Sequence, residues 1–85
     1  MEHTYACKGT CSRGLHFQLN DQHIVTDVQF DGGCNGNTKG IARLCEGMKA
    51  EDIIQRLEGT RCGMKNTSCP DQLCQALRQA LAAMQ

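Results

Sequence analysis

The sequence has few aromatic residues, a single proline and no excess of charge. Its 85 residues contain no tryptophan, one tyrosine and two phenylalanines, and nine basic side chains balance nine acidic ones. This balance gives no electrostatic reason to expect binding to nucleic acid or to an anionic membrane. No apolar run approaches the ~20 residues that span a bilayer, and the first residues lack the basic start and apolar middle of a signal peptide. We therefore expect a cytoplasmic protein that binds neither nucleic acid nor membrane.

Several chemical motifs are also missing. There is no Cys-x-x-Cys pair anywhere, which excludes zinc ribbons, thioredoxin-like motifs and ferredoxin runs. The glycine-rich stretch from Gly32 to Gly36 matches neither the dinucleotide fingerprint nor the phosphate-binding P-loop. No Ser-His-Asp set and no carboxylate pair emerges, so we name no catalytic residue and do not expect catalysis by the chain alone.

Cysteine, in contrast, is abundant, with seven residues in a chain of 85. In a secreted protein such a count would indicate disulfides. The count is odd and no export signal is visible, so a reducing compartment is favoured, where cysteines more often bind metal or take part in catalysis. The alternative is that they are buried as small apolar side chains. The length allows one domain, residues 1–85, with a modest core that a metal, a partner or disulfides would help to stabilise.

The N-terminal half has the alternation of β-strands. Tyr5-Ala6-Cys7 predicts a short edge strand, and Leu15, Phe17 and Leu19 alternate with polar residues in a half-buried strand. A third strand follows, in which we expect one face to carry Ile24, Val28 and Phe30 and the opposite face Val25, Asp27 and Gln29. Together these predict a three-stranded antiparallel sheet built on an N-terminal hairpin.

Three helices are predicted after the sheet. The first starts near Asn37 or Thr38 and ends at Gly47, with one face formed by Ile41, Leu44, Cys45 and Met48. The second covers about residues 50–58 and ends at Gly59. The third begins at Ser68, an N-cap residue. Its apolar face comprises Leu73, Leu77, Leu81 and Met84, and its polar face comprises Gln72, Gln75, Arg78 and Gln79. The fold class is therefore α+β, a small antiparallel sheet covered by two to three helices.

Four cysteines fall at the ends of these elements, where their sulfurs could share one site. They are Cys11, Cys34, Cys62 and Cys69. Thiolates are good ligands for zinc and iron. The spacing of the four cysteines in the sequence, however, is equally compatible with metal binding and with burial of the cysteines as apolar side chains. The remaining cysteines are assigned otherwise: Cys45 shares the apolar face of its helix, and Cys74 lies about 140° around the helix from Cys69. Cys7 could pair with Cys11 as ligands or as a redox couple, but a buried strand residue is favoured.

The segment Thr67-Ser68-Cys69-Pro70-Asp71 resembles the signature of the TSCPD domain, which is named for this pentapeptide. The stretches 31–37, 47–48, 57–59 and 62–63 also resemble the small stand-alone proteins of that family. The resemblance implies a relation to the C-terminal region of cobalamin-dependent ribonucleotide reductases. It also implies that Cys11, Cys34, Cys62 and Cys69 are the family's recurrent cysteines. A role in deoxyribonucleotide synthesis and DNA replication, with a ribonucleotide reductase as partner, follows as an expectation.

The order of elements is also similar to that of iron–sulfur scaffold proteins of the IscU/NifU type, with Cys11, Cys34 and Cys69 as the matching sulfurs. Three functions are therefore expected: a zinc or iron module that assists a ribonucleotide reductase, an iron–sulfur or metal carrier, and a thiol–disulfide relay. A small interaction domain with buried cysteines is the remaining alternative. The sequence leaves open the identity of the metal, the partner and whether the chain forms a homodimer.

Overall fold

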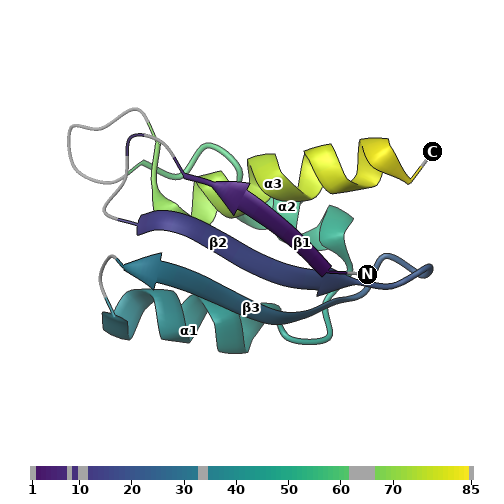
Figure 1. Cartoon of the computed structure of the whole chain (residues 1–85), viewed down its shortest axis with the longest axis horizontal. Coiled ribbons are helices and arrows are strands. Elements are labelled where there is room, and N and C mark those ends of the chain that lie inside the picture. Colours follow the sequence, from purple (N-terminus) through teal and green to yellow (C-terminus); the bar gives the residue numbers. More distant parts are fainter. Residues whose placement is uncertain (1, 8, 10–11, 33–34, 62–66, 85) are drawn as a thin grey trace.

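The computed structural model describes residues 2–7, 9, 12–32, 35–61 and 67–84, although not the side chains of Ser12 and Asn35. Three strands precede three helices, so the predicted α+β class is confirmed. Figure 1 shows the helices packed on one side of the sheet, with α1 beside β3 and α3 crossing β1 and β2. The elements are β1 (Glu2–Ala6), β2 (Ser12–Leu19), β3 (Val25–Gly32), α1 (Asn35–Cys45), α2 (Ala50–Leu57) and α3 (Cys69–Ala83).

The sheet is antiparallel, with the strand order β1-β2-β3. The edge strand was predicted at Tyr5-Ala6-Cys7, but β1 begins at Glu2 because it pairs with β2 over its whole length, from Glu2 opposite Gln18 to Ala6 opposite Gly14. Cys7 follows the strand, and its N–H still donates to the carbonyl oxygen of Arg13 at 3.1 Å.

The prediction for the buried face of β3 was partly wrong. Val25 and Val28 are both buried, at 0% and 6% exposure, although strict alternation put them on opposite faces. The register explains this, because between the pairs His16–Gln29 and Gln18–Thr26 one residue of β2 lies opposite two residues of β3, which is a β-bulge. Asp27 occupies the bulge with φ of 55°, and its N–H donates to a carboxylate oxygen of Glu46 at 3.0 Å.

The first helix starts earlier than predicted, at Asn35 instead of Asn37 or Thr38. The helix ends at Cys45, and Gly47 follows it with φ of +82°. This left-handed conformation just after a helix favours glycine, so the predicted role of Gly47 in ending the helix is confirmed. Cys45 is buried as expected, whereas Leu44 is 77% exposed and does not belong to the buried face.

The other two helices confirm the predicted boundaries closely. α2 ends at Leu57, and Gly59 follows with φ of +87°. In α3 the Ser68 side chain accepts a hydrogen bond from the N–H of Asp71, which is the expected N-cap. One detail was wrong: Gln72 was placed on the polar face but is buried, and its amide donates to the Thr67 hydroxyl at 3.1 Å.

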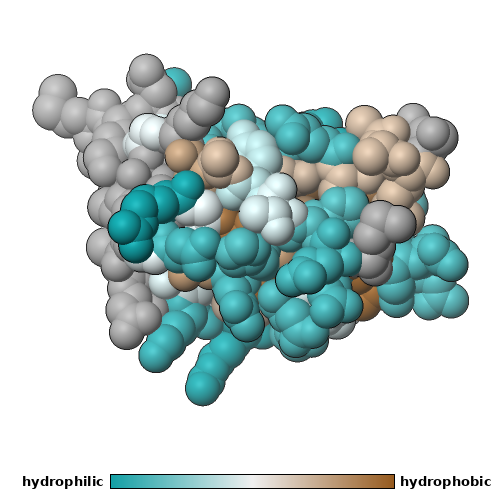
Figure 2. All heavy atoms as spheres, viewed as in Figure 1, coloured by the Kyte–Doolittle hydropathy of each residue, from teal (hydrophilic) through white to brown (hydrophobic). Residues whose placement is uncertain are grey.

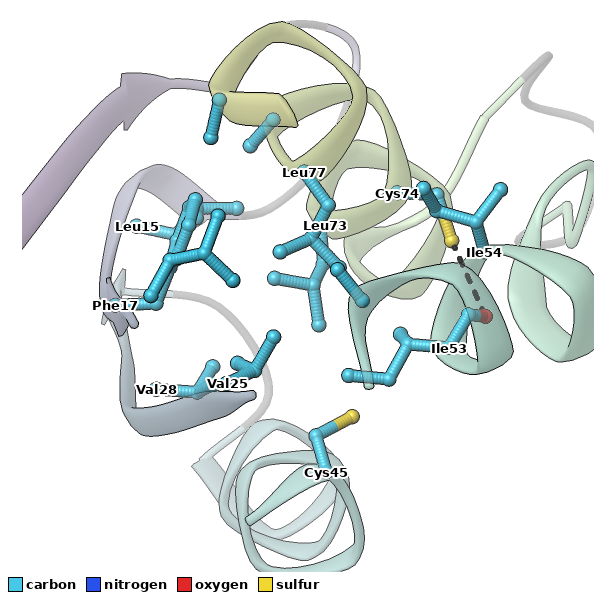
Figure 3. Packing of buried hydrophobic residues seen from close by; sticks show 14 residues of the cluster. Leu15, Phe17, Val25, Val28, Cys45, Ile53, Ile54, Leu73, Cys74 and Leu77 are labelled. Carbon is cyan, nitrogen blue, oxygen red and sulfur yellow. Dashed lines mark hydrogen bonds between the residues drawn. The ribbon is translucent and has the colours of Figure 1, made fainter. Parts of the chain in front are cut away.

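The core lies between the sheet and the helices (Figure 3). Side chains from β2 and β3 meet those of α2 and α3, and Cys45 of α1 closes the lower side in this view. The largest of these buried side chains belong to Phe17, Leu15, Leu19, Ile53, Leu73 and Leu77. Burial of this set stabilises the arrangement of the strand and helix ends on which the candidate site depends.

The opposite side of the sheet is polar. Figure 2 views this side and shows mainly hydrophilic side chains over the strands. His16 lies here, with one ring nitrogen 2.8 Å from an Asp31 carboxylate oxygen and the other 3.2 Å from the Thr4 hydroxyl. Within the described part of the chain, no helix has the length and apolar character needed to cross a membrane.

Candidate cysteine site at one end of the sheet

The start of α3 gives Cys69 a defined position. Ser68 caps the helix, Pro70 lies in its first turn, where no intrahelical N–H bond is required, and Cys69 is the first helical residue. The free N–H groups and the helix dipole at this end favour negative charge. The side chain of Cys69 is partly exposed. A partly exposed sulfur in this position is accessible to a metal ion or to a reaction partner.

Asp71 connects this helix start to the chain that precedes it. One carboxylate oxygen accepts from the N–H of Gly59 at 2.8 Å, and the other accepts from the Thr67 hydroxyl at 2.5 Å and the Gln75 amide at 3.1 Å. Burial acts to raise the pKa of Asp71, but the hydrogen bonds from Thr67, Gly59 and Gln75 outweigh it and lower the pKa. Asp71 is therefore ionised, and it acts as a clamp because its hydrogen bond holds Gly59 against the start of α3.

A second clamp acts between the same two segments. The Ser68 hydroxyl donates to the carbonyl oxygen of Thr60 at 2.6 Å while it accepts from the helix. Together, Ser68 and Asp71 hold Gly59 and Thr60 against the beginning of α3. The described residues on both sides of the segment that contains Cys62 are therefore fixed beside Cys69.

Three of the four predicted site residues, Cys11, Cys34 and Cys62, lie outside the described residues. Their described neighbours can be located. Ser12, which follows Cys11, is the strand partner of Gly32, which precedes Cys34 by two positions. The start of β2, the end of β3, the start of α1 and the start of α3 all lie at the same end of the molecule in Figure 1.

The connection between β1 and β2 reaches the same end. Gly9 has φ of +76°, and a Cβ atom added to it would lie 3.2 Å from Cγ2 of Thr67. The backbone before Cys11 therefore packs directly against the residue that begins the pentapeptide Thr67–Asp71. Glycine is needed here, because the positive φ and the close approach both disfavour a side chain.

Cys7 also lies at this end of the fold, between Tyr5, which hydrogen-bonds to Gln75 of α3, and Gly9, which lies against Thr67. The sequence interpretation missed this position. It was taken as a buried strand residue, but it lies just past β1 and is only partly buried. Burial raises the pKa of Cys7 to about 11, with further contributions from the nearby sulfur of Cys69 and the carboxylate of Asp31. The spacing Cys7-x-x-x-Cys11 was the one signal in the sequence that pointed to this end of the chain.

Cys45 and Cys74 belong to the core instead, as predicted for Cys45. They are 2% and 0% exposed, and Figure 3 shows both among aliphatic side chains. The Cys74 thiol lies 3.7 Å from the carbonyl oxygen of Ile53, to which it donates. Burial, followed by the nearby charges of Asp71 and Glu58, raises the pKa of Cys74 to about 12. Both therefore remain protonated near neutral pH and serve as packing groups.

Among the described residues, no three His, Cys, Asp or Glu side chains form a group that could hold a metal ion. This search includes only one of the four predicted ligands, so the predicted site remains a prediction. The donor chemistry at this end is suitable for zinc or iron, because cysteine sulfur is a ligand that both metals accept.

The described elements form a small α+β domain, and the candidate site lies at the start of its last helix. The TSCPD domain model matches residues 2–81, nearly the whole chain. The chain therefore belongs to the TSCPD domain family. No curated protein and no solved structure matches it.

Proposed function

We propose that the chain is a cysteine-based metal-binding module for zinc or iron and that it assists a ribonucleotide reductase. Cys11, Cys34, Cys62 and Cys69 would be the ligands, and a tetrahedral set of four thiolates would suit either metal. The module would act in assembly of the reductase, in access of substrate or in delivery of reducing equivalents to it.

The observation that carries the metal-binding part is the convergence of chain segments at one end of the fold. Gly9 contacts Thr67, Ser12 pairs with Gly32, and Ser68 hydrogen-bonds to Thr60. Each of these contacts joins two segments that flank different predicted ligands. A metal site assembled from distant parts of a chain needs this kind of convergence, because its ligands come from several elements at once.

The reductase part rests on the family. TSCPD domains resemble the C-terminal region of cobalamin-dependent ribonucleotide reductases, so a reductase of this class is the partner we propose. An accessory role is favoured over catalysis, because nucleotide reduction needs a radical generator, a nucleotide pocket and a reductant pair. A chain of 85 residues with two phenylalanines and one tyrosine is too small to form all three of these sites.

The direct test is the content of metal and inorganic sulfide per chain in protein purified without oxygen. We expect about one zinc or iron ion per chain in the wild type and a large loss in Cys69→Ser. Cys45→Ala is the matched control, because Cys45 is buried away from this end, and it should keep its metal. Capture of a cobalamin-dependent reductase by the wild type, and weaker capture by Cys69→Ser, tests the partner.

Each outcome separates the candidate functions. Zinc that is lost together with the fold indicates a structural site in a binding module. Iron with sulfide favours an iron–sulfur carrier, which should transfer its cluster to an acceptor protein. Unchanged metal content and unchanged reductase capture in Cys69→Ser would refute the proposal.

A further inference from the structure

β1 and the first turns of α3 lie side by side, although they are some sixty residues apart in the sequence. The Tyr5 hydroxyl donates to the side-chain oxygen of Gln75 at 3.4 Å. At the other end of the contact, Gly9 lies against Thr67. Cys7 falls between Tyr5 and Gly9, so it faces the part of α3 that begins at Cys69.

The alternation of β1 orients the Cys7 side chain. Glu2, Thr4 and Ala6 are exposed, whereas His3 and Tyr5 are partly buried on the side that faces the helices. Cys7 continues this pattern: it is partly buried and packs against the hydrophobic core. Its sulfur therefore lies on the same side of the strand as the Tyr5 ring, which contacts α3. Cys69, the first residue of α3, lies in the sequence between Thr67 and Gln75, the two residues that Gly9 and Tyr5 contact.

We propose that Cys7 and Cys69 form a dithiol that reacts with disulfides and closes to an intramolecular disulfide. Cys69, at the helix N-terminus, attacks one sulfur of a small-molecule or protein disulfide and releases one thiolate. Cys7 then loses its proton to solvent and attacks the Cys69 sulfur of the mixed disulfide, which releases the second thiolate. Two electrons pass from the two cysteines to the disulfide substrate, which leaves as two thiols, and the S–S bond joins Cys7 to Cys69.

This inference does not depend on the proposed metal site, and it is tested on protein freed of metal by a chelator. It also differs from a relay among the four predicted ligands, because Cys7 is not one of them. Both thiols are partly exposed, as exchange with a disulfide requires, whereas Cys45 and Cys74 are enclosed in the core.

The experiment treats the folded, reduced full chain with oxidised glutathione and identifies the disulfides by tryptic digestion and mass spectrometry. Cys7 is the only cysteine in peptide 1–8, and Cys69 lies in peptide 66–78 with Cys74, from which fragment spectra distinguish it. We expect peptide 1–8 linked through Cys69 as the main product and about two equivalents of glutathione released per pair.

The matched variant is Cys7→Ser, which keeps a small polar side chain after β1. It should lose the linked peptide, accumulate Cys69 joined to glutathione, and release about one equivalent of glutathione from this site. Circular dichroism of the reduced variant checks that it is folded, and Cys7→Ala serves as the second variant. A main product that joins Cys7 to Cys11 or to another cysteine, or that leaves Cys7 unmodified, would overturn the proposal.

Discussion

The four cysteines that the structure describes occupy two regions that differ in their exposure to solvent. Cys45 and Cys74 lie in the interior, at 2% and 0% exposure, where burial disfavours the thiolate. Cys7 and Cys69 lie at the end of the sheet and are partly exposed, although burial raises the pKa of Cys7 as well. The same residue type is a packing group in one region and a candidate ligand or nucleophile in the other. Position within an element, more than the number of cysteines, therefore decides the role.

The largest expected contrast between the regions is in thiol reactivity. In folded, metal-free protein at pH 8, iodoacetamide should modify Cys69 at least about 100-fold faster than Cys74, because Cys74 reacts only when the core opens. Fragment spectra of tryptic peptide 66–78, which contains both residues, measure the two rates separately. In urea the two rates should approach each other, and similar rates in the native state would contradict the division into two regions.

Removal of core volume should have the next largest effect. Leu77→Ala should lower the free energy of unfolding by about 2 to 5 kcal/mol, because the side chain is fully buried and its loss leaves a cavity. Leu44→Ala is the matched control at a 77% exposed leucine and should change it by less than about 0.5 kcal/mol. Urea unfolding measures both. Equal losses would mean that Leu44 is covered by another part of the protein or by a partner.

The hydrogen bonds by which Asp71 holds Gly59 against the start of α3 should contribute an intermediate amount to stability. Asp71→Asn should lower the free energy of unfolding by about 1 to 3 kcal/mol, because the amide cannot accept all three hydrogen bonds of the carboxylate. Gln79→Asn, on the exposed side of the same helix, is a control for substitutions to asparagine in α3. No difference between the two variants would mean that Asp71 does not clamp the site.

The clamp also predicts a pH dependence. The pKa of Asp71 is lowered in the folded protein, so the unfolded chain binds more protons at acidic pH. The stability difference between wild type and Asp71→Asn should therefore be constant above the unfolded pKa of about 4 and decrease as the pH falls below it. Urea unfolding at a series of pH values measures this. A difference that grows on acidification would contradict the assignment.

The smallest expected effect concerns the helix cap. Ser68→Ala should cost about 1 kcal/mol, because it removes the acceptor for the Asp71 N–H and the donor to Thr60. Ser68→Thr keeps the hydroxyl and should recover most of the loss. If both variants were equally unstable, lost packing around Ser68 and not capping would explain the effect.

Local chemistry made much of the fold predictable. Capping residues and positive-φ glycines fixed the ends of the helices, as Ser68, Gly47 and Gly59 show. Alternation located β2 correctly. It failed for β3, because the bulge at Asp27 depends on pairing with β2 and contact with Glu46, which no local pattern reports. Leu44 was misplaced for a similar reason, since helical periodicity does not say which neighbours a helix has.

For the candidate site, the sequence located Cys69 at a helix start but did not show what lies beside it. The proximity of Cys7 arises from the packing of β1 against α3, a contact between segments distant along the chain. The buried hydrogen bonds of Asp71 are of the same kind, because Gly59 belongs to the preceding turn. Such contacts follow from tertiary packing, and the spacing of residues along the sequence does not predict them.

The most direct test of the proposed metal site is protection of individual cysteines by zinc. Metal-free protein is labelled with iodoacetamide with and without zinc, with magnesium as the control ion. Labelling is quantified in each tryptic peptide, and fragment spectra separate Cys69 from Cys74 in peptide 66–78. We expect zinc to slow the labelling of Cys11, Cys34, Cys62 and Cys69 together by at least about tenfold, because metal-bound thiolates are not free to react. Equal labelling of these four with zinc and with magnesium would contradict a metal site at this end of the fold.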